Sequence, residues 1–181
     1  MIISGVARRY ARAIFELGLE EENYKTLFDE LEDFYRTLQE NPEAKEVIDS
    51  SVYNVQEKRR VLEAVLGEKN YLDRTRRFLQ LIFEKKRMPF MGQIIAGLKA
   101  LIEKHEGIER VEVTVPKALG DDQRKEIVKT LSEKSGKKIV LEEKVEPSII
   151  GGVIIKAGST VYDGSVKNQI HKLGENLKKG R

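Results

Sequence analysis

Residues 149–173 read IIGGVIIKAGSTVYDGSVKNQIHKL and carry the most specific pattern in the chain. A pair of glycines precedes the apolar run VIIK, a Gly-Ser-Thr turn leads to a second run, TVY, and Asp-Gly-Ser opens an amphipathic segment. This order predicts two short strands joined by a tight turn and followed by a helix. None of these side chains forms a reactive group, so the pattern predicts a structural unit.

A phosphate-binding loop is the first alternative for this glycine-rich segment. Such a loop follows a strand and leads into a helix, with a lysine next to Ser or Thr. Here Gly151 and Gly152 precede the strand, and Lys156 lies inside it. Close approach of two backbones or a bend in the strand explains the glycines better. The sequence therefore predicts no nucleotide site and no cofactor.

The remaining polar residues of the segment indicate turns and a helix cap. Gly158 permits a tight reversal, Gly164 could adopt a positive φ, and Asp163 or Ser165 could cap the final helix. An Asp–Ser pair could also serve acid–base chemistry, but no histidine lies in a plausible third position. Capping is the favoured interpretation. The final helix is expected to present one apolar stripe, made of Val166, Ile170, Leu173 and Leu177.

Residues 1–106 show helical periodicity throughout. Apolar residues recur at three- and four-residue spacing, and boundary signals separate the runs. Asn41-Pro42 predicts a cap with proline at the first helical position, and Asn54 with Glu57 predicts a capping box. Six short amphipathic helices with brief turns predict a bundle; they begin near residues 6, 24, 42, 55, 72 and 90.

The pattern changes at Gly107. Val111, Val113 and Val115 alternate with polar residues, which is typical of a strand that Pro116 ends. A helix over residues 121–136 and a strand over 139–145 follow, the latter with Glu142 and Glu143 expected in solvent. The fold class is therefore mostly α: a six-helix bundle over residues 1–106, then a small α+β domain over residues 107–181 with the order β-α-β-β-β-α.

Composition excludes several functional classes. The 181 residues include no cysteine and two histidines, so disulfides, thiolate chemistry and a metal site are not expected. A formal net charge of +3 does not force binding to nucleic acid or acidic membranes. The longest apolar runs are too short to span a bilayer, and the N-terminal segment is expected to belong to the mature fold.

A basic cluster between Arg74 and Arg87 supports one alternative, an RNA-binding accessory protein. Such a protein would neutralise phosphates with these cations and stack bases on exposed aromatic rings. Phe78 and Phe83 could supply the rings, but their spacing fits a buried helix face better. No recognised RNA-binding motif accompanies them.

Two separated motifs resemble one family, the delta subunit of bacterial F-type ATP synthases, which is related to the mitochondrial oligomycin-sensitivity-conferring protein. ARRYARAIF, at residues 7–15, resembles the family's first helix, and IIGGVIIKAGSTVYDGS, at residues 149–165, resembles its C-terminal signature. FLQLIFEKKRM resembles the fifth helix and its terminal arginine. This chain departs from the family pattern at two places. Relatives often carry Asn-Gly before that arginine, where this chain has Lys85-Lys86. Pro116 interrupts a segment that in relatives usually consists of small, flexible residues.

The resemblance implies a non-catalytic stator in the peripheral stalk, which holds the catalytic head against rotor torque during proton-driven ATP synthesis. By the same resemblance, residues 1–106 bind the N-terminal helix of an alpha subunit in a groove between the first and fifth helices, and residues 107–181 meet the b subunits. The protein is expected at the cytoplasmic face of the bacterial inner membrane, as a peripheral component without direct membrane insertion or nucleic-acid binding.

The resemblance also nominates individual residues. Small Ala7 and Ala11 would let a partner helix approach, while Tyr10 and Ile14 would anchor it; both larger residues could instead fill the bundle core. The matching fifth-helix candidates are Phe78, Leu81, Ile82 and Lys85. The residues expected to set the shape of the C-terminal signature are Gly151, Gly152, Gly158, Asp163, Gly164 and Ser165.

Overall fold

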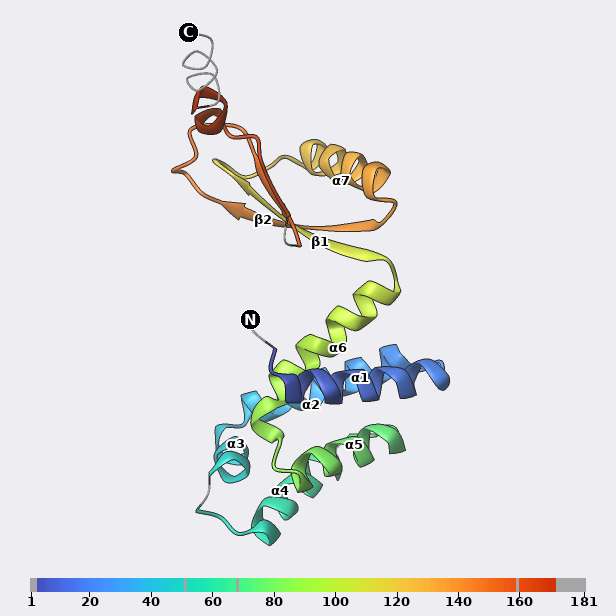
Figure 1. Ribbon diagram of the computed structural model, residues 1–181. Helices are drawn as coiled ribbons and strands as arrows, with labels where there is room; N and C mark the ends of the chain where they lie inside the picture. The colour runs from blue at the N-terminus through green and yellow to red at the C-terminus, as the bar shows by residue number, and fades with distance from the viewer. Residues whose placement is uncertain (1–2, 51, 68, 159, 172–181) are drawn as a thin grey trace. The chain divides into compact units, whose positions relative to one another are not determined.

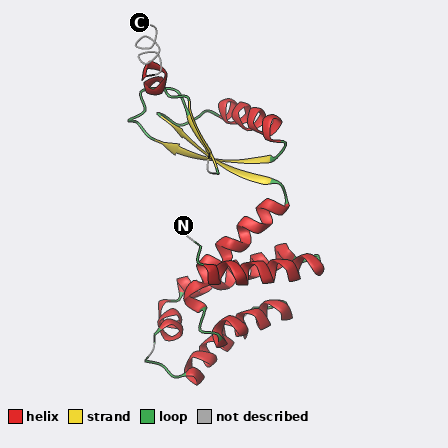
Figure 2. Ribbon diagram, viewed as in Figure 1, coloured by secondary structure: helices red, strands yellow, loops and turns green. Residues whose placement is uncertain are grey.

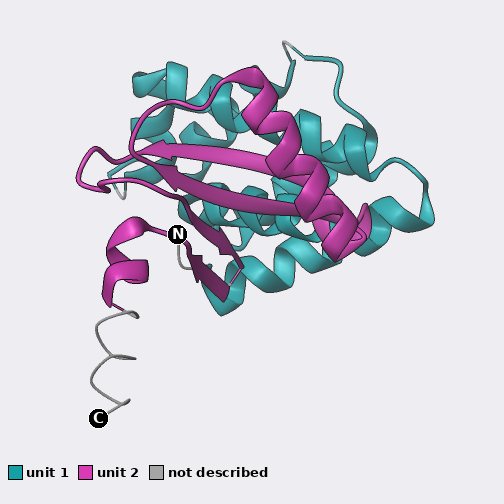
Figure 3. Ribbon diagram, turned by 90° about the horizontal axis from the view of Figure 1, so that it is seen from above, with its two compact units in different colours: residues 1–102 teal, residues 103–181 magenta. Residues whose placement is uncertain are grey.

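The computed structural model describes residues 3–50, 52–67, 69–158 and 160–171 (Figure 1). The chain divides into two compact units, Met1–Ile102 and Glu103–Arg181, which Figure 3 colours teal and magenta. Within the described residues, strands occur in unit 2, and unit 1 is helical (Figure 2). The predicted fold class, mostly helical with a small α+β part, is confirmed at this level.

The helices of unit 1 share one hydrophobic core. Each is amphipathic and turns its apolar side inward, which buries residues such as Leu31, Phe34, Leu79 and Leu98 almost completely. The elements are α1 (Gly5–Glu20), α2 (Tyr24–Glu40), α3 (Pro42–Asp49), α4 (Val55–Gly67), α5 (Asp73–Glu84), the 3-10 helix η1 (Met88–Phe90) and α6 (Met91–His105), which continues into unit 2.

Small residues let α1 and α6 approach closely. Ala7 and Ala11 on α1 have no exposed surface, and a Cβ added to Gly97 of α6 would lie 3.1 Å from the Ala11 Cβ. This contact leaves no room for a larger side chain at Ala11 or at Gly97. Ala7 and Ala11 therefore serve the internal packing of unit 1.

The capping interaction predicted from the local sequence is present at the start of α4 but not at the start of α3. The Asn54 side chain accepts hydrogen bonds from the backbone N–H groups of Gln56 and Glu57, and Glu57 accepts one from the Asn54 N–H at 2.9 Å. The predicted capping box is thus present. Pro42 occupies the first turn of α3, but the Asn41 side chain does not cap that helix. It donates instead to the Thr37 carbonyl at 2.7 Å, at the end of α2.

Two helices of unit 1 end in the left-handed conformation without a glycine. After α5, the Lys86 N–H donates to the Phe83 carbonyl and the Arg87 N–H to the Ile82 carbonyl, each at 2.9 Å, and Lys86 has φ 56°. After α1, Glu22 has φ 54° in the same hydrogen-bond pattern. This is the Schellman motif, in which glycine is the favoured residue.

Lys86→Gly is therefore expected to raise the free energy of unfolding by roughly 0.5–1 kcal/mol, because glycine adopts positive φ without the penalty of a Cβ. Glu22→Gly should give a similar gain. Lys85→Gly is the matched control, since Lys85 has φ −80° and should only lose stability. Urea denaturation measures all three, and equal effects at residues 85 and 86 would contradict the explanation.

Unit 2 is built on a four-stranded sheet with the order β2-β1-β3-β4. The strands are β1 (Ile108–Val115), β2 (Lys138–Val145), β3 (Ile154–Ala157) and β4 (Thr160–Asp163). β1 and β2 are parallel and connected through α7 (Asp121–Ser135), while β3 is antiparallel to both β1 and β4. Residues 166–171 are helical; Leu173 and Leu177 of the predicted stripe lie outside the described residues.

The core of unit 2 is small and one-sided. Val111, Val113 and Val115 of β1 and Ile139 of β2 are its buried apolar residues. α7 packs on this core through side chains that are only half-buried: Ile127, Val128 and Leu131. A helix with no fully buried residue covers its sheet incompletely.

The expectation that Glu142 and Glu143 lie in solvent holds for Glu142, which is exposed, and is wrong for Glu143. The Arg110 guanidinium donates to Glu142 at 2.7 Å. Glu143, whose side chain is 11% exposed, accepts the Leu119 backbone N–H at 3.0 Å and pairs with Arg124 at 2.6 Å. These contacts join β2 to β1 and to the start of α7, so both carboxylates stabilise the unit.

The glycine-rich signature brings two backbone segments together. The Gly164 N–H donates to the Val153 carbonyl and the Val166 N–H to the Gly151 carbonyl, each at 2.9 Å. Ser165 is buried, and its Oγ accepts the Asn168 N–H at 3.2 Å, which caps the last helix. Asp163 accepts the Ser165 N–H at 2.9 Å and so supports the cap.

Gly164 does not have a positive φ, but two other glycines of the signature do. Gly152 has φ 86° and Gly158 has φ 58°. Gly164 instead allows close approach, since an added Cβ would lie 3.1 Å from the Val153 carbonyl oxygen. At Gly152, an added Cβ would overlap the Gly164 carbonyl oxygen and lie 2.9 Å from the Ser165 Cα. Gly152 thus meets both requirements at once.

Candidate partner-binding surfaces

Within the residues that the structure describes, no three or more His, Cys, Asp or Glu side chains gather where they could hold a metal ion. A search of the same residues finds no helix with the length and apolar character needed to cross a membrane. Both units expose large apolar side chains, among them Leu81 and Tyr162.

The nominated residues of α1 and α5 divide into a buried and an accessible group. Ala7, Ala11, Ile14 and Ile82 are at most 1% exposed, so the isolated chain does not offer them to a partner. Phe78 is 7% exposed, and Tyr10 is half-buried. Leu81 is 41% exposed and Lys85 is exposed as well. The first group belongs to the core of unit 1 in the isolated chain.

α1 and α5 approach each other through side chains. The rings of Tyr10 and Phe78 meet edge to face, with centroids 6.4 Å apart. Arg74, at the start of α5, donates to Glu21, just after the end of α1, at 2.6 Å. These two contacts mean that the helices run antiparallel, as Figure 1 also shows. The Tyr10–Phe78 pair marks the seam between them.

Residues next to this seam form what we call the α1–α5 surface. On α1 they are spaced three and four residues from Tyr10 or from one another, and on α5 they follow Phe78 at the same spacing, so they share its side of each helix. Leu17 is 38% exposed and Ala13 is also exposed. The set is Val6, Tyr10, Ala13 and Leu17 from α1, with Leu81 and Lys85 from α5.

Sequence reasoning missed Val6, Ala13 and Leu17 as site residues. Periodicity shows that these residues share an apolar face with Tyr10, but it does not say which edge of that face is left open. Only the positions of α2 and α6 decide that Ala7 and Ala11 turn inward. The sequence does contain one signal for these residues. The apolar stripe on α1 is wider than the strip that one neighbouring helix covers, so part of it is expected to stay exposed.

The arginines of α5 are largely engaged within the chain. Arg74 pairs with Glu21, and Arg77 lies 3.5 Å from Asp73. The Arg76 guanidinium donates to the carbonyls of Lys69 and Tyr71, at 2.6 and 3.2 Å. The aromatic rings proposed for base stacking, on Phe78 and Phe83, are buried. The rings proposed for base stacking are therefore not accessible, while Lys85 and Lys86 of the basic cluster are exposed.

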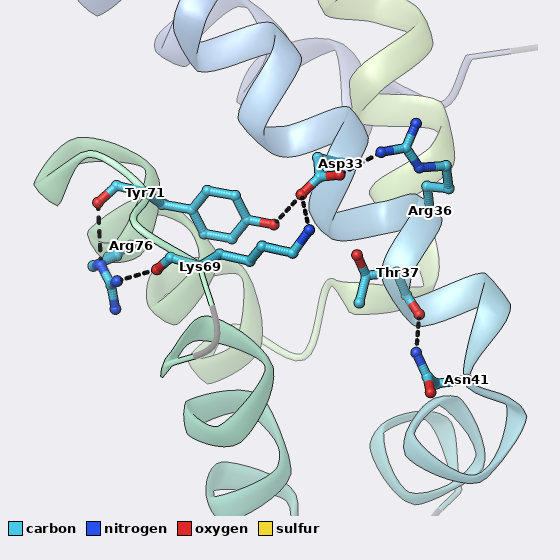
Figure 4. A network of polar contacts seen from close by, with 7 residues as sticks. All are labelled: Asp33, Arg36, Thr37, Asn41, Lys69, Tyr71 and Arg76. Carbon is cyan, nitrogen blue, oxygen red and sulfur yellow. Dashed lines mark hydrogen bonds and ion pairs between the residues drawn. The ribbon is translucent and has the colours of Figure 1, made fainter.

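A polar network fixes the segment before α5 to α2 (Figure 4). Asp33 accepts hydrogen bonds from the Tyr71 hydroxyl at 2.8 Å and from the Lys69 ammonium at 3.0 Å, and it also pairs with Arg36. Nearby, Glu30 accepts the Leu72 N–H at 3.0 Å and the Thr75 hydroxyl. The Tyr71 hydroxyl, and next to it Lys69, hold the pKa of the Asp33 carboxyl below its ordinary value.

Unit 1 is therefore expected to lose stability in acid. Because the pKa of Asp33 is lower in the folded chain, its contribution is full above the unfolded pKa of about 4 and disappears as pH falls through the folded value. Urea denaturation between pH 7 and pH 2 measures this loss. Asp33→Asn should be less stable at pH 7 and should show a flatter pH profile; an unchanged profile would exclude this cause.

Unit 2 has an apolar cavity of about 670 Å³ between α7 and the sheet. Ile127 and Leu131 of α7 line one side, and Ile155 and Tyr162 of β3 and β4 line the other. Tyr162 is 62% exposed. The cavity lies where α7 leaves the sheet uncovered. Its size and lining suit apolar side chains of a second macromolecule.

Comparison with known proteins gives one consistent family. The model for the ATP synthase delta (OSCP) subunit family matches residues 6–177. ATP synthase subunit delta of Geobacter metallireducens is 36% identical over 180 residues, which cover 99% of this chain and 100% of that protein. The same-named protein of Syntrophus aciditrophicus is 37% identical over 177 residues, 96% of each chain.

A solved structure supports the fold. The chain is similar to one in the cryo-EM structure of the Toxoplasma gondii mitochondrial ATP synthase hexamer, with a TM-score of 0.67 and 24% identity. The match covers 96% of this chain and 98% of the other.

Proposed function

Because this chain belongs to the ATP synthase delta (OSCP) subunit family, we propose that it is a non-catalytic subunit of the peripheral stalk of an ATP synthase. In this role it joins the catalytic alpha–beta head to the b subunits, so that the head resists rotor torque while ATP is made. The proposal places it at the cytoplasmic face of the inner membrane, as part of the complex and not inserted in the bilayer.

The observation that carries the proposal is the presence of two separate apolar surfaces, one on each unit. The α1–α5 surface exposes Ala13, Leu17 and Leu81, and the cavity of unit 2 exposes Tyr162. A stator adaptor needs two durable interfaces and no reactive centre.

For unit 1 we propose that α1–α6 act as one bundle whose α1–α5 surface binds the N-terminal helix of an alpha subunit. An amphipathic helix can lay its apolar stripe along Tyr10, Leu17 and Leu81. Ala13 allows its backbone to approach closely. The buried residues Ala7, Ala11 and Ile14 of α1 and Ile82 of α5 contribute by fixing these two helices in the core, and they do not touch the partner.

For unit 2 we propose that the cavity beside α7 receives an amphipathic helix of a b subunit. This helix would cover Ile155 and Tyr162 and would complete the apolar layer that Ile127 and Leu131 begin. The signature residues around Gly152 and Ser165 support this surface by fixing the start of β3 next to the end of β4. They are structural and do not contact the partner.

Affinity purification of the tagged full-length protein from native membranes tests both interfaces. The unchanged protein should retain alpha and b subunits together. Leu17→Asp/Leu81→Asp should lose alpha and keep b. Thr130 of α7 lines the cavity together with Tyr162, so Thr130→Arg/Tyr162→Asp should lose b and keep alpha. All four side chains are exposed, so these substitutions should leave the fold intact. Recovery of neither subunit with the unchanged protein would refute the proposal.

A further inference from the structure

The charges of α1 run in the order that its own dipole disfavours. Arg8, Arg9 and Arg12 lie in its first half, whereas Glu16 and Glu20 lie in its second, and Glu21 and Glu22 follow directly. No acidic residue occupies the first turn and no basic residue the last. A helix is stabilised by acids near its N-terminus and bases near its C-terminus, so this order is unfavourable for α1 alone.

Contacts within the chain account for only part of this arrangement. Arg8 donates to the Ile3 carbonyl at 3.4 Å, and Glu21 pairs with Arg74. Arg9, Arg12, Glu16 and Glu20 are exposed, and none has an ion pair among the described residues. The reversed order of these four charges therefore does not hold the fold together.

Three of these charges border the α1–α5 surface. Arg9 precedes Ala13 by four residues, Glu16 follows Ala13 by three, and Glu20 follows Leu17 by three. Since α5 runs antiparallel to α1, Lys85 near its end lies toward the start of α1 and adds a positive charge there. Arg74, Arg77 and Glu84 of α5 lie in the opposite order, but each pairs within the chain, with Glu21, Asp73 and Arg59. The unpaired charges therefore make the surface positive toward the start of α1 and negative toward its end.

We propose that this polarity sets the direction in which a helix docks on the α1–α5 surface. A partner helix whose charges follow its own dipole, acids first and bases last, lies parallel to α1. Its acidic first turns then face Arg9 and Lys85, and its basic last turns face Glu16 and Glu20. The inference rests on the docking proposed above and adds the charge order and direction of the partner.

The size of the preference follows from exposed ion pairs. Each such pair changes an equilibrium by about 1.4-fold to 5-fold. Three or four pairs that form in one direction and are replaced by like charges in the other give a preference of roughly tenfold or more at low salt. Salt screens exposed charges, so the preference should shrink toward unity at about 1 M.

The test uses the full-length protein, labelled with nitrogen-15, and a synthetic helical peptide of about 18 residues. The peptide carries a leucine stripe, glutamates in its first two turns, lysines in its last two, and a nitroxide at its N-terminus. α1 is about 24 Å long, which is enough for the nitroxide to distinguish its ends. Amides of residues 5–9 should be broadened strongly at low salt, and those of residues 17–20 much less.

A charge-exchanged variant gives the matched control. Arg9→Glu/Glu16→Lys/Glu20→Lys/Lys85→Glu alters exposed side chains only, and it should move the broadening to residues 17–20. Equal broadening at both ends, or a pattern that the variant leaves unchanged, would overturn the inference while docking itself stands. No shift of any α1 or α5 resonance on adding the peptide would overturn both the inference and the proposed docking.

Discussion

Gly152→Ala is expected to destabilise unit 2 by roughly 3 kcal/mol, because an added Cβ makes a closer approach here than at any other described glycine. The left-handed φ of 86° disfavours any side chain, and the new Cβ would overlap the Gly164 carbonyl and crowd the Ser165 backbone. Relief requires residues 151–153 and 164–166 to separate. That movement breaks the hydrogen bond from Gly164 to Val153 and disturbs the Ser165 cap.

Gly158→Ala is the matched control. Gly158 also has positive φ, 58°, but an added Cβ meets nothing within 4 Å, so the expected loss is about 1 kcal/mol. Hydrogen exchange separates the effects on the two units, because amides of β1 report on unit 2 and amides of α2 on unit 1. Equal losses for the two alanine variants would show that backbone conformation matters and close approach does not.

Adjacent residues of α5 should separate folding from binding. Ile82 has no exposed surface, so Ile82→Ala is expected to cost 2–5 kcal/mol of unfolding free energy, as about three methyl-sized groups leave a packed core. Leu81 is 41% exposed, so Leu81→Ala should change stability by less than about 0.5 kcal/mol. Urea denaturation and titration with the alpha-subunit helix measure the two properties.

The binding results should show the opposite order. Leu81→Ala is expected to weaken helix binding about tenfold or more while the melting temperature is kept. Ile82→Ala should bind nearly as well as the unchanged protein under conditions where it remains folded. If Leu81→Ala binds normally, the α1–α5 surface is misplaced by at least one helical position.

Patterns in the sequence predict most elements of this fold, because periodicity reports burial directly. The alternation of Val111, Val113 and Val115 gives β1, and Asn54 with Glu57 gives the start of α4. Local signals fail where a distant residue competes. The Asn41 side chain donates to the Thr37 carbonyl of the preceding helix and does not cap α3. Glu143 pairs with Arg124 and accepts the Leu119 N–H.

The candidate surfaces were less predictable for a related reason. Ala7, Ala11 and Ala13 are equally small, and only the placement of α2 and α6 decides that the first two are buried and the third is exposed. Similarly, no local signal shows that Lys86 must adopt a left-handed conformation, since the residue type argues against it. The cavity of unit 2 depends on how far α7 extends over the sheet, which is a property of packing.

Isothermal titration of the full-length protein with a synthetic alpha-subunit N-terminal helix tests the central claim most directly. The account predicts saturable one-to-one binding, weakened about 100-fold or more in Leu17→Asp/Leu81→Asp, with the melting temperature of that variant unchanged. Equal binding by the variant, or no saturable binding by a folded unchanged protein, would contradict the assignment of the α1–α5 surface as the contact with the head.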